Sequence, residues 1–209
     1  RAKTTVVPLG IAYIASTPSS KDLGPSPSGL RLLAVGRLSC YKGFDVLIDA
    51  LARHADASLL LIGHGERERE LRALAAARHL DHRIEFAGDL DDATLAHAYA
   101  TADVFVLPSL DRSEAFGLVL LEAMRAGLPV IASAIAGSGV GHVVEAGQTG
   151  LLTPPGDASA LADAIERLRD AHLRTRFGAA GRARWAQAFT LQRSASAVRA
   201  VYQGMENTP

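Results

Sequence analysis

Short apolar runs alternate, over residues 30–152, with segments whose apolar positions recur at helical spacing. The runs are strand-length and lack an apolar–polar alternation, which predicts strands covered on both faces. We expect strands over residues 30–35, 58–62, 84–87, 104–107, 130–132 and 150–152. Helices are expected over residues 43–53, 66–79, 91–100 and 116–126, with a short segment at 139–146. This alternation predicts an α/β fold with a doubly wound parallel sheet of the Rossmann-like kind.

The two ends of the chain differ from this central part. After Asp157, an expected N-cap, helices are predicted to about residue 171, then over 173–189 and 191–205. A short strand is predicted over residues 4–11. Residues 16–29 carry three prolines and no periodicity, which is typical of a flexible linker. We therefore expect residues 1–15 to be the remnant of a preceding domain and residues 30–189 to be one α/β domain.

Composition narrows the class of protein. The 209 residues are 48% hydrophobic, which argues against disorder. Lys plus Arg and Asp plus Glu each number 22, so nothing indicates a nucleic-acid partner. The longest apolar stretches are strand-length, too short for a transmembrane span. One cysteine, Cys40, allows no intramolecular disulfide and fits a reducing compartment.

A glycine-bearing loop follows the first predicted strand of the domain and precedes a predicted helix. It contains Gly36, Arg37, Lys42 and Gly43. Unpaired backbone N–H groups at a helix start, with two cations beside them, are suited to a phosphate or pyrophosphate. The alternative interpretation is a solvated junction whose Gly and Lys serve only the turn and solubility.

Two carboxylates, Glu114 and Glu122, stand eight residues apart in an otherwise apolar stretch. Glu122 is expected two turns inside a helix that ends at Gly127 and Pro129. A glutamate is seldom buried without a partner, which makes Glu122 a candidate functional residue. The structural alternative is a partly exposed helix residue or a satisfied core carboxylate.

Other clusters give weaker signals. Gly63-His64-Gly65 begins like a dinucleotide fingerprint but lacks its third glycine. His79 and His82 fit the solvated end of a helix better than a metal site. No metal site is expected. Because the loops with Arg37, Lys42, Asp89, Glu114 and Gly137 all follow predicted strands, one sheet edge should gather them.

Together these motifs resemble a known family. The chain resembles the C-terminal half of a retaining, nucleotide-sugar-dependent glycosyltransferase of the GT-B architecture, in the large family that includes sucrose synthase and bacterial cell-envelope mannosyltransferases. The resemblance covers roughly residues 30–205. In chain order, the matching segments are Gly36-Arg37 with Lys42-Gly43, Phe86-Ala87-Gly88-Asp89-Leu90, residues 102–109, Glu114 with Glu122, residues 127–133, residues 147–152 and Pro155-Gly156-Asp157.

The resemblance implies a role for each matching residue. Arg37 and Lys42, with Gly36, would bind the diphosphate. Glu114 would contact the donor sugar, and Phe116 and Gly117 would present backbone N–H groups at the start of the following helix. Ala115 and Leu118 are also expected in the donor site. Glu122 would accept hydrogen bonds from the ribose hydroxyls, and Asp89 and Leu90 would lie beside the base. Glu114, Arg37 and Lys42 are the expected catalytic residues, and no cofactor is expected.

One position departs from the family pattern. Many members have a glutamate in the Gly137 loop where this chain has Gly141, and a partial replacement by His142 stays open. The last helix, within residues 190–209, would pack on the N-terminal domain through Val198, Val201 and Tyr202. Packing of these side chains on the domain's own core is the alternative.

The resemblance also implies an activity: sugar transfer from a nucleoside-diphosphate sugar, with a lean towards GDP-mannose, to a cell-envelope polysaccharide, lipopolysaccharide or lipid-linked acceptor. The expected location is the cytoplasm, at the inner face of the membrane if the missing N-terminal domain associates peripherally. Alternatives are a nucleotide-sugar epimerase or phosphorylase of the same architecture, or a non-catalytic nucleotide-binding module. As a fragment, the chain is expected to bind a donor nucleotide without transferring sugar.

Overall fold

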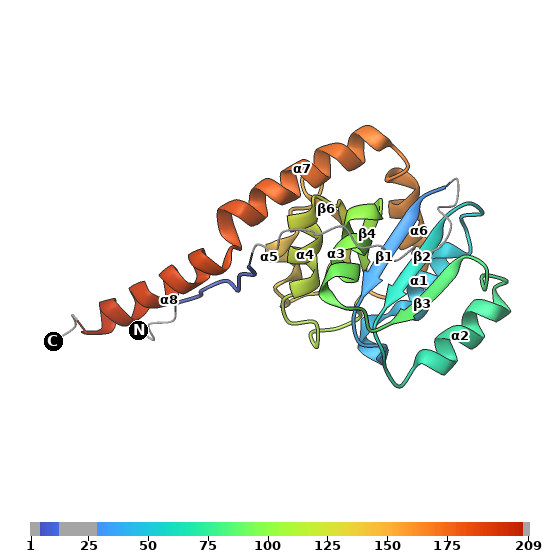
Figure 1. The fold of residues 1–209 in the computed structure, drawn as a ribbon, viewed down its shortest axis with the longest axis horizontal. Coiled ribbons are helices and arrows are strands. Elements are labelled where there is room, and N and C mark those ends of the chain that lie inside the picture. The colour runs from blue at the N-terminus through green and yellow to red at the C-terminus, as the bar shows by residue number, and fades with distance from the viewer. Residues whose placement is uncertain (1–4, 13–28, 207–209) are drawn as a thin grey trace.

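The computed structural model describes residues 5–12 and 29–206, and within them the chain folds around a six-stranded sheet (Figure 1). The strands follow the order β3-β2-β1-β4-β5-β6, and every neighbouring pair is parallel. The expected doubly wound α/β sheet is therefore confirmed. Their bounds are β1 (Arg31–Val35), β2 (Ser58–Ile62), β3 (Ile84–Gly88), β4 (Val104–Leu107), β5 (Val130–Ser133) and β6 (Gly150–Thr153).

Helices cover both faces of the sheet, so each strand is buried on two sides. On β1, Leu32 and Ala34 face one hydrophobic core and Leu33 faces the other. The first core is closed by α1 (Phe44–Leu51), α2 (Glu68–Ala77) and α6 (Ala158–Arg167). The second is closed by α3 (Asp92–Thr101), α4 (Leu118–Ala126) and α5 (Val140–Val143). This double burial explains why the strands show no polar alternation.

Helix ends are where the structure departs most from the expected bounds. α4 begins at Leu118 rather than 116, because Gly117 has a left-handed φ of 77°. α2 begins at Glu68 rather than 66 and ends at Ala77, and His79 lies in the left-handed region with φ 57°. The segment expected over 139–146 is a helix only at Val140–Val143, since Val144 is extended. Asp157 is the N-cap of α6, as expected: its side chain accepts from the N–H of Ala160.

The strand expected over residues 4–11 is not formed within residues 5–12. Residues 5–10 have no regular structure, since Pro8 lacks an N–H and no strand lies alongside to pair with. Ile11 makes one parallel bridge with Thr190: its N–H donates to the Phe189 carbonyl, and its own carbonyl accepts from Leu191, both over 3.0 Å. The expected linker, residues 16–29, lies outside the described residues apart from Gly29.

Two helices complete the chain, α7 (Ala171–Ala188) and α8 (Leu191–Glu206). α7 lies against α4, where Gly178 allows the two backbones to meet: a side chain there would collide with the Gly127 carbonyl. α8 projects away from the sheet (Figure 1). Val198 and Tyr202 are exposed, so their packing on the domain's own core is excluded. Their contact with another domain stays a prediction.

Candidate functional site

The carboxyl ends of the strands form one edge of the sheet, and the chain reverses direction across it between β1 and β4. Crossovers from β1 run towards β2 and β3, whereas those from β4 run towards β5 and β6. Loops that leave such a switch point diverge, and the crevice between them is the usual ligand site of open α/β sheets. The loops after β1, β2, β3 and β4 all open at this edge.

Lys42 is carried into this crevice by the loop after β1. A single 3-10 turn, Cys40–Lys42, ends at Gly43, which has a left-handed φ of 64° and begins α1. Gly43 is required here, since any side chain would collide with the Pro108 carbonyl in the loop after β4. The Lys42 side chain packs over Gly36, where an added carbon would lie 3.3 Å from Nζ.

Glu114 meets Lys42 from the loop after β4. Lys42 Nζ lies 2.7 Å from Glu114 Oε2, and the two side chains are 9% and 10% exposed. The fully buried Ser109 hydroxyl donates to the same carboxylate oxygen over 3.0 Å. A buried ion pair with a third hydrogen-bonding group is fixed in one geometry. The structure therefore brings together two of the expected catalytic residues, in contact with each other.

The rest of that loop is anchored to the loop after β5. The Ser138 hydroxyl donates to the Glu114 carbonyl, and the N–H of Gly139 donates to the Ala115 carbonyl over 2.7 Å. Gly137, on the same loop, lies beside the Arg112 side chain. Three loops, after β1, β4 and β5, are thus joined around Glu114.

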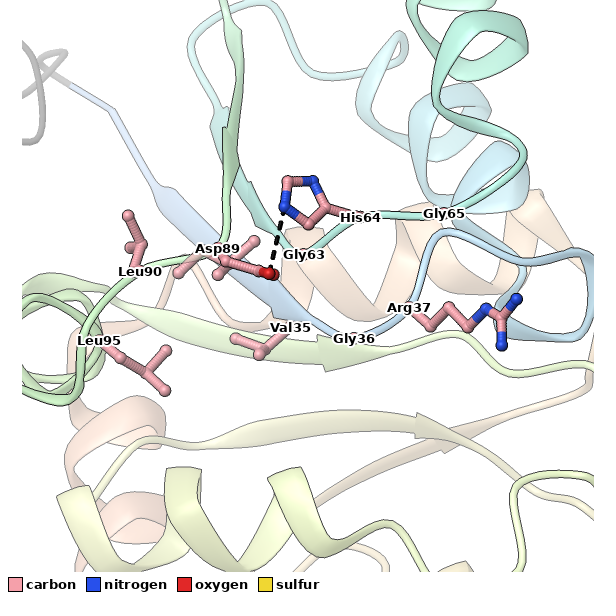
Figure 2. A pocket seen from close by; sticks show the side chains of 10 residues that line it. Val35, Gly36, Arg37, Gly63, His64, Gly65, Asp89, Leu90 and Leu95 are labelled. Atoms are coloured by element: carbon pink, nitrogen blue, oxygen red, sulfur yellow. Dashed lines mark ion pairs between the residues drawn. The ribbon is translucent and has the colours of Figure 1, made fainter.

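A cavity of about 600 Å³ opens beside this cluster, between the loops after β1, β2 and β3 (Figure 2). Four expected donor-binding residues, Gly36, Arg37, Asp89 and Leu90, line it. Its remaining lining comes from Val35, Ile62, Gly63, His64, Gly65 and Leu95. Apolar walls with a few charged groups at the rim are suited to a flat organic ring.

Two polar contacts mark the rim of the cavity. His64 Nε2 lies 3.1 Å from Asp89 Oδ2, and Figure 2 shows the two side chains meeting across the opening. The Arg37 side chain is 73% exposed and pairs with Glu66 over 3.4 Å. Arg37 and Lys42 therefore stand in different surroundings: one guanidinium at the surface, one buried ammonium.

Glu122 does not line the cavity. It lies one turn inside α4 rather than two, because the helix begins at Leu118. Its side chain is half-buried, and Oε2 accepts a 2.7 Å hydrogen bond from the Tyr99 hydroxyl of α3. Tyr99 is one turn beyond Leu95, which lines the cavity.

The expected N–H groups of Phe116 and Gly117 lie at the start of α4. The N-cap of α4 is Gly117, so no side chain caps the start of this helix. Phe116 is half-buried and packs edge-on against Phe189 at 6.1 Å, while Leu118 is exposed. His142 also packs edge-on against Phe189, at 5.8 Å. This contact places His142 on the aromatic cluster and leaves its replacement of the family glutamate a prediction.

Three residues of the site were not expected from the sequence: His64, Ser109 and Tyr99. His64 follows a strand between two glycines, which is the signal that could have found it once β2 is placed beside β1. Ser109 directly follows Pro108 at a strand end. Tyr99 lies on α3, where the sequence alone suggests a core aromatic.

Among residues 5–12 and 29–206, no group of three or more His, Cys, Asp and Glu side chains is placed to hold a metal ion. No helix in the same part of the chain has the length and apolar character needed to cross a bilayer.

The parallel sheet, its switch point and the crevice above it place the chain in the Rossmann-like class of nucleotide-binding α/β folds. Comparison with known proteins gives the family: residues 17–184 match the model of glycosyl transferases group 1, and the chain belongs to that family.

Relatives and solved structures agree with this assignment. The chain is 40% identical over 182 residues to phosphatidyl-myo-inositol mannosyltransferase of Mycobacterium leprae, covering 84% of this chain and 47% of the relative. It matches sucrose-phosphate synthase of Thermosynechococcus elongatus with a TM-score of 0.85 and 33% identity, covering 98% and 53% of the two chains. It matches Anabaena Alr3699/HepE, solved with UDP and glucose, with a TM-score of 0.75 and 27% identity, covering 84% and 48%. The chain spans about half the length of the relatives it matches.

Proposed function

We propose that this chain is the donor-binding part of a retaining glycosyltransferase that uses a nucleoside-diphosphate sugar. The observation that carries the proposal is Lys42: a buried ammonium paired with the buried Glu114 at the switch point of the sheet, next to the cavity that Gly36 and Arg37 line. Membership of the glycosyl transferases group 1 family supports it, as does the UDP and glucose in the Anabaena structure.

The diphosphate would lie between Arg37 and Lys42. An ammonium has three N–H donors, and one is committed to Glu114, which leaves two for phosphate oxygens. Arg37 is free to swing from Glu66, because an exposed pair of this kind contributes little. Both cations would stabilise the charge that grows on the leaving diphosphate, so this chemistry needs no metal ion.

The remaining groups would hold the base, ribose and sugar. The base would enter the cavity beside Asp89 and Leu90, and Glu122 would accept from the ribose hydroxyls. Glu114 would face the donor sugar with its carboxylate held by Lys42 and Ser109. The N–H groups at the start of α4 would point towards the same ligand. The configuration at the anomeric carbon would be retained, with the departing phosphate acting as the base towards the acceptor hydroxyl.

The particular donor and acceptor belong to the proposal as well. Similarity to the M. leprae mannosyltransferase favours a donor of the GDP-mannose type, whereas the Anabaena structure holds UDP. The acceptor would be an envelope polysaccharide, lipopolysaccharide or lipid-linked sugar. An N-terminal domain of the same polypeptide would complete the cleft, on the cytoplasmic face of the membrane.

Calorimetric titration tests the proposal. GDP and UDP, each beside its bare nucleoside, are titrated into the chain and into Lys42→Met, whose side chain is of similar length without charge. We expect the chain to bind one diphosphate more tightly than its nucleoside, and Lys42→Met to abolish most of that difference. Binding of neither diphosphate, or an unchanged difference in a folded Lys42→Met variant, would refute the phosphate role.

A further inference from the structure

Tyr99 is a buried phenol whose hydroxyl makes one hydrogen bond to the described part of the chain. Its side chain is 3% exposed, and its hydroxyl donates to Glu122 Oε2 over 2.7 Å. A buried hydroxyl without an acceptor would cost free energy, so the contact satisfies Tyr99. The same contact acts on its partner, Glu122, which is half-buried on α4.

The phenol is held rigidly. Its ring packs against Phe105 of β4, with centroids 5.7 Å apart and planes tilted by 31°. Phe105 is itself fully buried in the central part of the sheet. Packing against Phe105 of β4 thus holds the Tyr99 ring in place. The Tyr99 hydroxyl in turn holds one carboxylate oxygen of Glu122.

The hydroxyl stays a donor across the working range of pH. Burial, and then the nearby Glu122 carboxylate, raise the Tyr99 pKa well above its ordinary value of 10.0, and Arg125 opposes this only in part. Within residues 5–12 and 29–206, the second oxygen of Glu122, Oε1, has no hydrogen-bond donor. One oxygen is anchored while the other is left available.

Such an arrangement changes what a glutamate can do. A glutamate side chain loses rotamer entropy when a ligand immobilises it. Anchoring one oxygen in advance removes part of that cost from the binding step. It also restricts rotation of the carboxylate plane, so the remaining acceptor positions point in fixed directions.

We propose that Tyr99 is a positioning residue that orients the Glu122 carboxylate to accept hydrogen bonds from the vicinal hydroxyls of a ribonucleotide. The inference rests on the proposed donor-binding function, and it names a group that does not touch the ligand. Phe105, Tyr99 and Glu122 form a single line of support from the sheet to the sugar of the nucleotide.

The test compares ribose with deoxyribose. Tyr99→Phe keeps the ring on Phe105 and removes only the hydroxyl. Affinities for the preferred nucleoside diphosphate and its 2′-deoxy counterpart are measured by calorimetry. We expect Tyr99→Phe to lower the affinity for the ribonucleotide about tenfold and the affinity for the deoxynucleotide much less. A tenfold loss is the effect of one lost hydrogen bond to a charged group.

Three further variants complete the experiment. Glu122→Gln should lower the ratio of ribo to deoxy affinity at least as much as Tyr99→Phe. Because both act on one carboxylate, Tyr99→Phe combined with Glu122→Gln should lower the ratio no further than Glu122→Gln alone. Tyr202→Phe, on the exposed surface of α8, should leave every affinity unchanged. Thermal unfolding of each variant checks that the fold is intact.

Each contrary outcome has its own meaning. Equal weakening of ribo- and deoxynucleotide in Tyr99→Phe, or no weakening of either, would overturn the positioning role while Glu122 kept its own. An unchanged ratio in Glu122→Gln would remove the ribose contact from the proposed function and the inference with it. Failure of the parent chain to bind any nucleoside diphosphate would refute the proposed function itself, and with it the basis of this inference.

Discussion

Lys42 and Glu114 lie 72 residues apart in the chain and share a buried ion pair of 2.7 Å. The pair ties the loop after β1 to the loop after β4, across the point where the chain reverses direction over the sheet. Its two side chains are both in the expected donor site. The ion pair therefore has a structural role, because it holds the two sides of the crevice together, and a proposed role in binding the donor nucleotide.

The structural part can be measured in Lys42→Met. Removing one partner leaves Glu114 buried without its countercharge, and we expect a loss of about 3 kcal/mol in the free energy of unfolding. Adding Glu114→Gln should recover most of that loss, because the uncompensated charge is then gone. Denaturant titration of the single and double variants measures both changes. A Lys42→Met variant as stable as the parent would show that the pair contributes nothing to the fold.

Arg37→Ala should separate binding from stability. The Arg37–Glu66 pair is exposed on both sides, so its loss should change stability by about 0.5 kcal/mol or less. Affinity for the nucleoside diphosphate should fall by about 1.5–3 kcal/mol, and affinity for the bare nucleoside should barely change. Arg78→Ala, which removes the exposed pair with Asp49, is the matched control and should alter neither affinity. Equal losses for nucleotide and nucleoside would contradict a phosphate contact.

Ser109→Ala removes the hydroxyl's hydrogen bond to the Glu114 carboxylate and keeps the ion pair. Stability should fall by about 1.5–3 kcal/mol, the usual contribution of a hydrogen bond to a charged group. If Glu114 faces the donor sugar, a less firmly held carboxylate should lower the affinity for a sugar nucleotide more than the affinity for the corresponding diphosphate. Calorimetry with the two ligands checks this difference. The prediction fails if both ligands weaken alike.

Asp56→Asn tests a pH dependence away from the site. Two hydrogen bonds from Arg169 lower the pKa of Asp56 from 3.8 to about 2. A lowered folded-state pKa gives stability that is present above pH 3.8 and lost as the pH falls through about 2. The parent should thus be more stable than Asp56→Asn near neutral pH, and the difference should shrink between pH 4 and 2. Thermal unfolding over this range, with exposed Asp163→Asn as control, measures it; a difference that grows with acid has the wrong sign.

The chain by itself should bind a donor nucleotide without transferring its sugar. It spans about half the length of its relatives, and transfer requires an acceptor held against the donor in a closed cleft. Incubation with radiolabelled GDP-mannose and a panel of acceptors should give no glycosylated product, while titration gives binding. Transfer by the chain alone would contradict the two-domain interpretation.

The sheet could be predicted from the sequence because its strands are buried on both faces. That burial requires continuous apolar runs, and such runs are visible in the sequence without knowledge of partners. Helix ends could not be placed as well. They depend on backbone conformations at single residues, such as the left-handed φ of Gly117 and of His79.

The candidate site divides in a similar way. The convergence of Gly36, Arg37, Asp89 and Leu90 on one cavity follows from the rule that parallel strands end at one edge. The direct contact of Lys42 with Glu114 depends on side-chain positions that no spacing along the chain specifies. Tyr99 was missed for a related reason, since a helix aromatic among apolar neighbours is indistinguishable in sequence from a core residue.

The bridge between Ile11 and Thr190 has a mechanical consequence. It holds the segment that enters the α/β unit directly beside the one that leaves it, and Arg125 secures the entry through the Ala12 carbonyl. A second domain attached through both segments would be joined by two adjacent connections. Two adjacent connections bend readily about the line that joins them but resist twisting, so the joint would act as a hinge with a single axis. Its motion would follow one arc, and each closure would return to the same place.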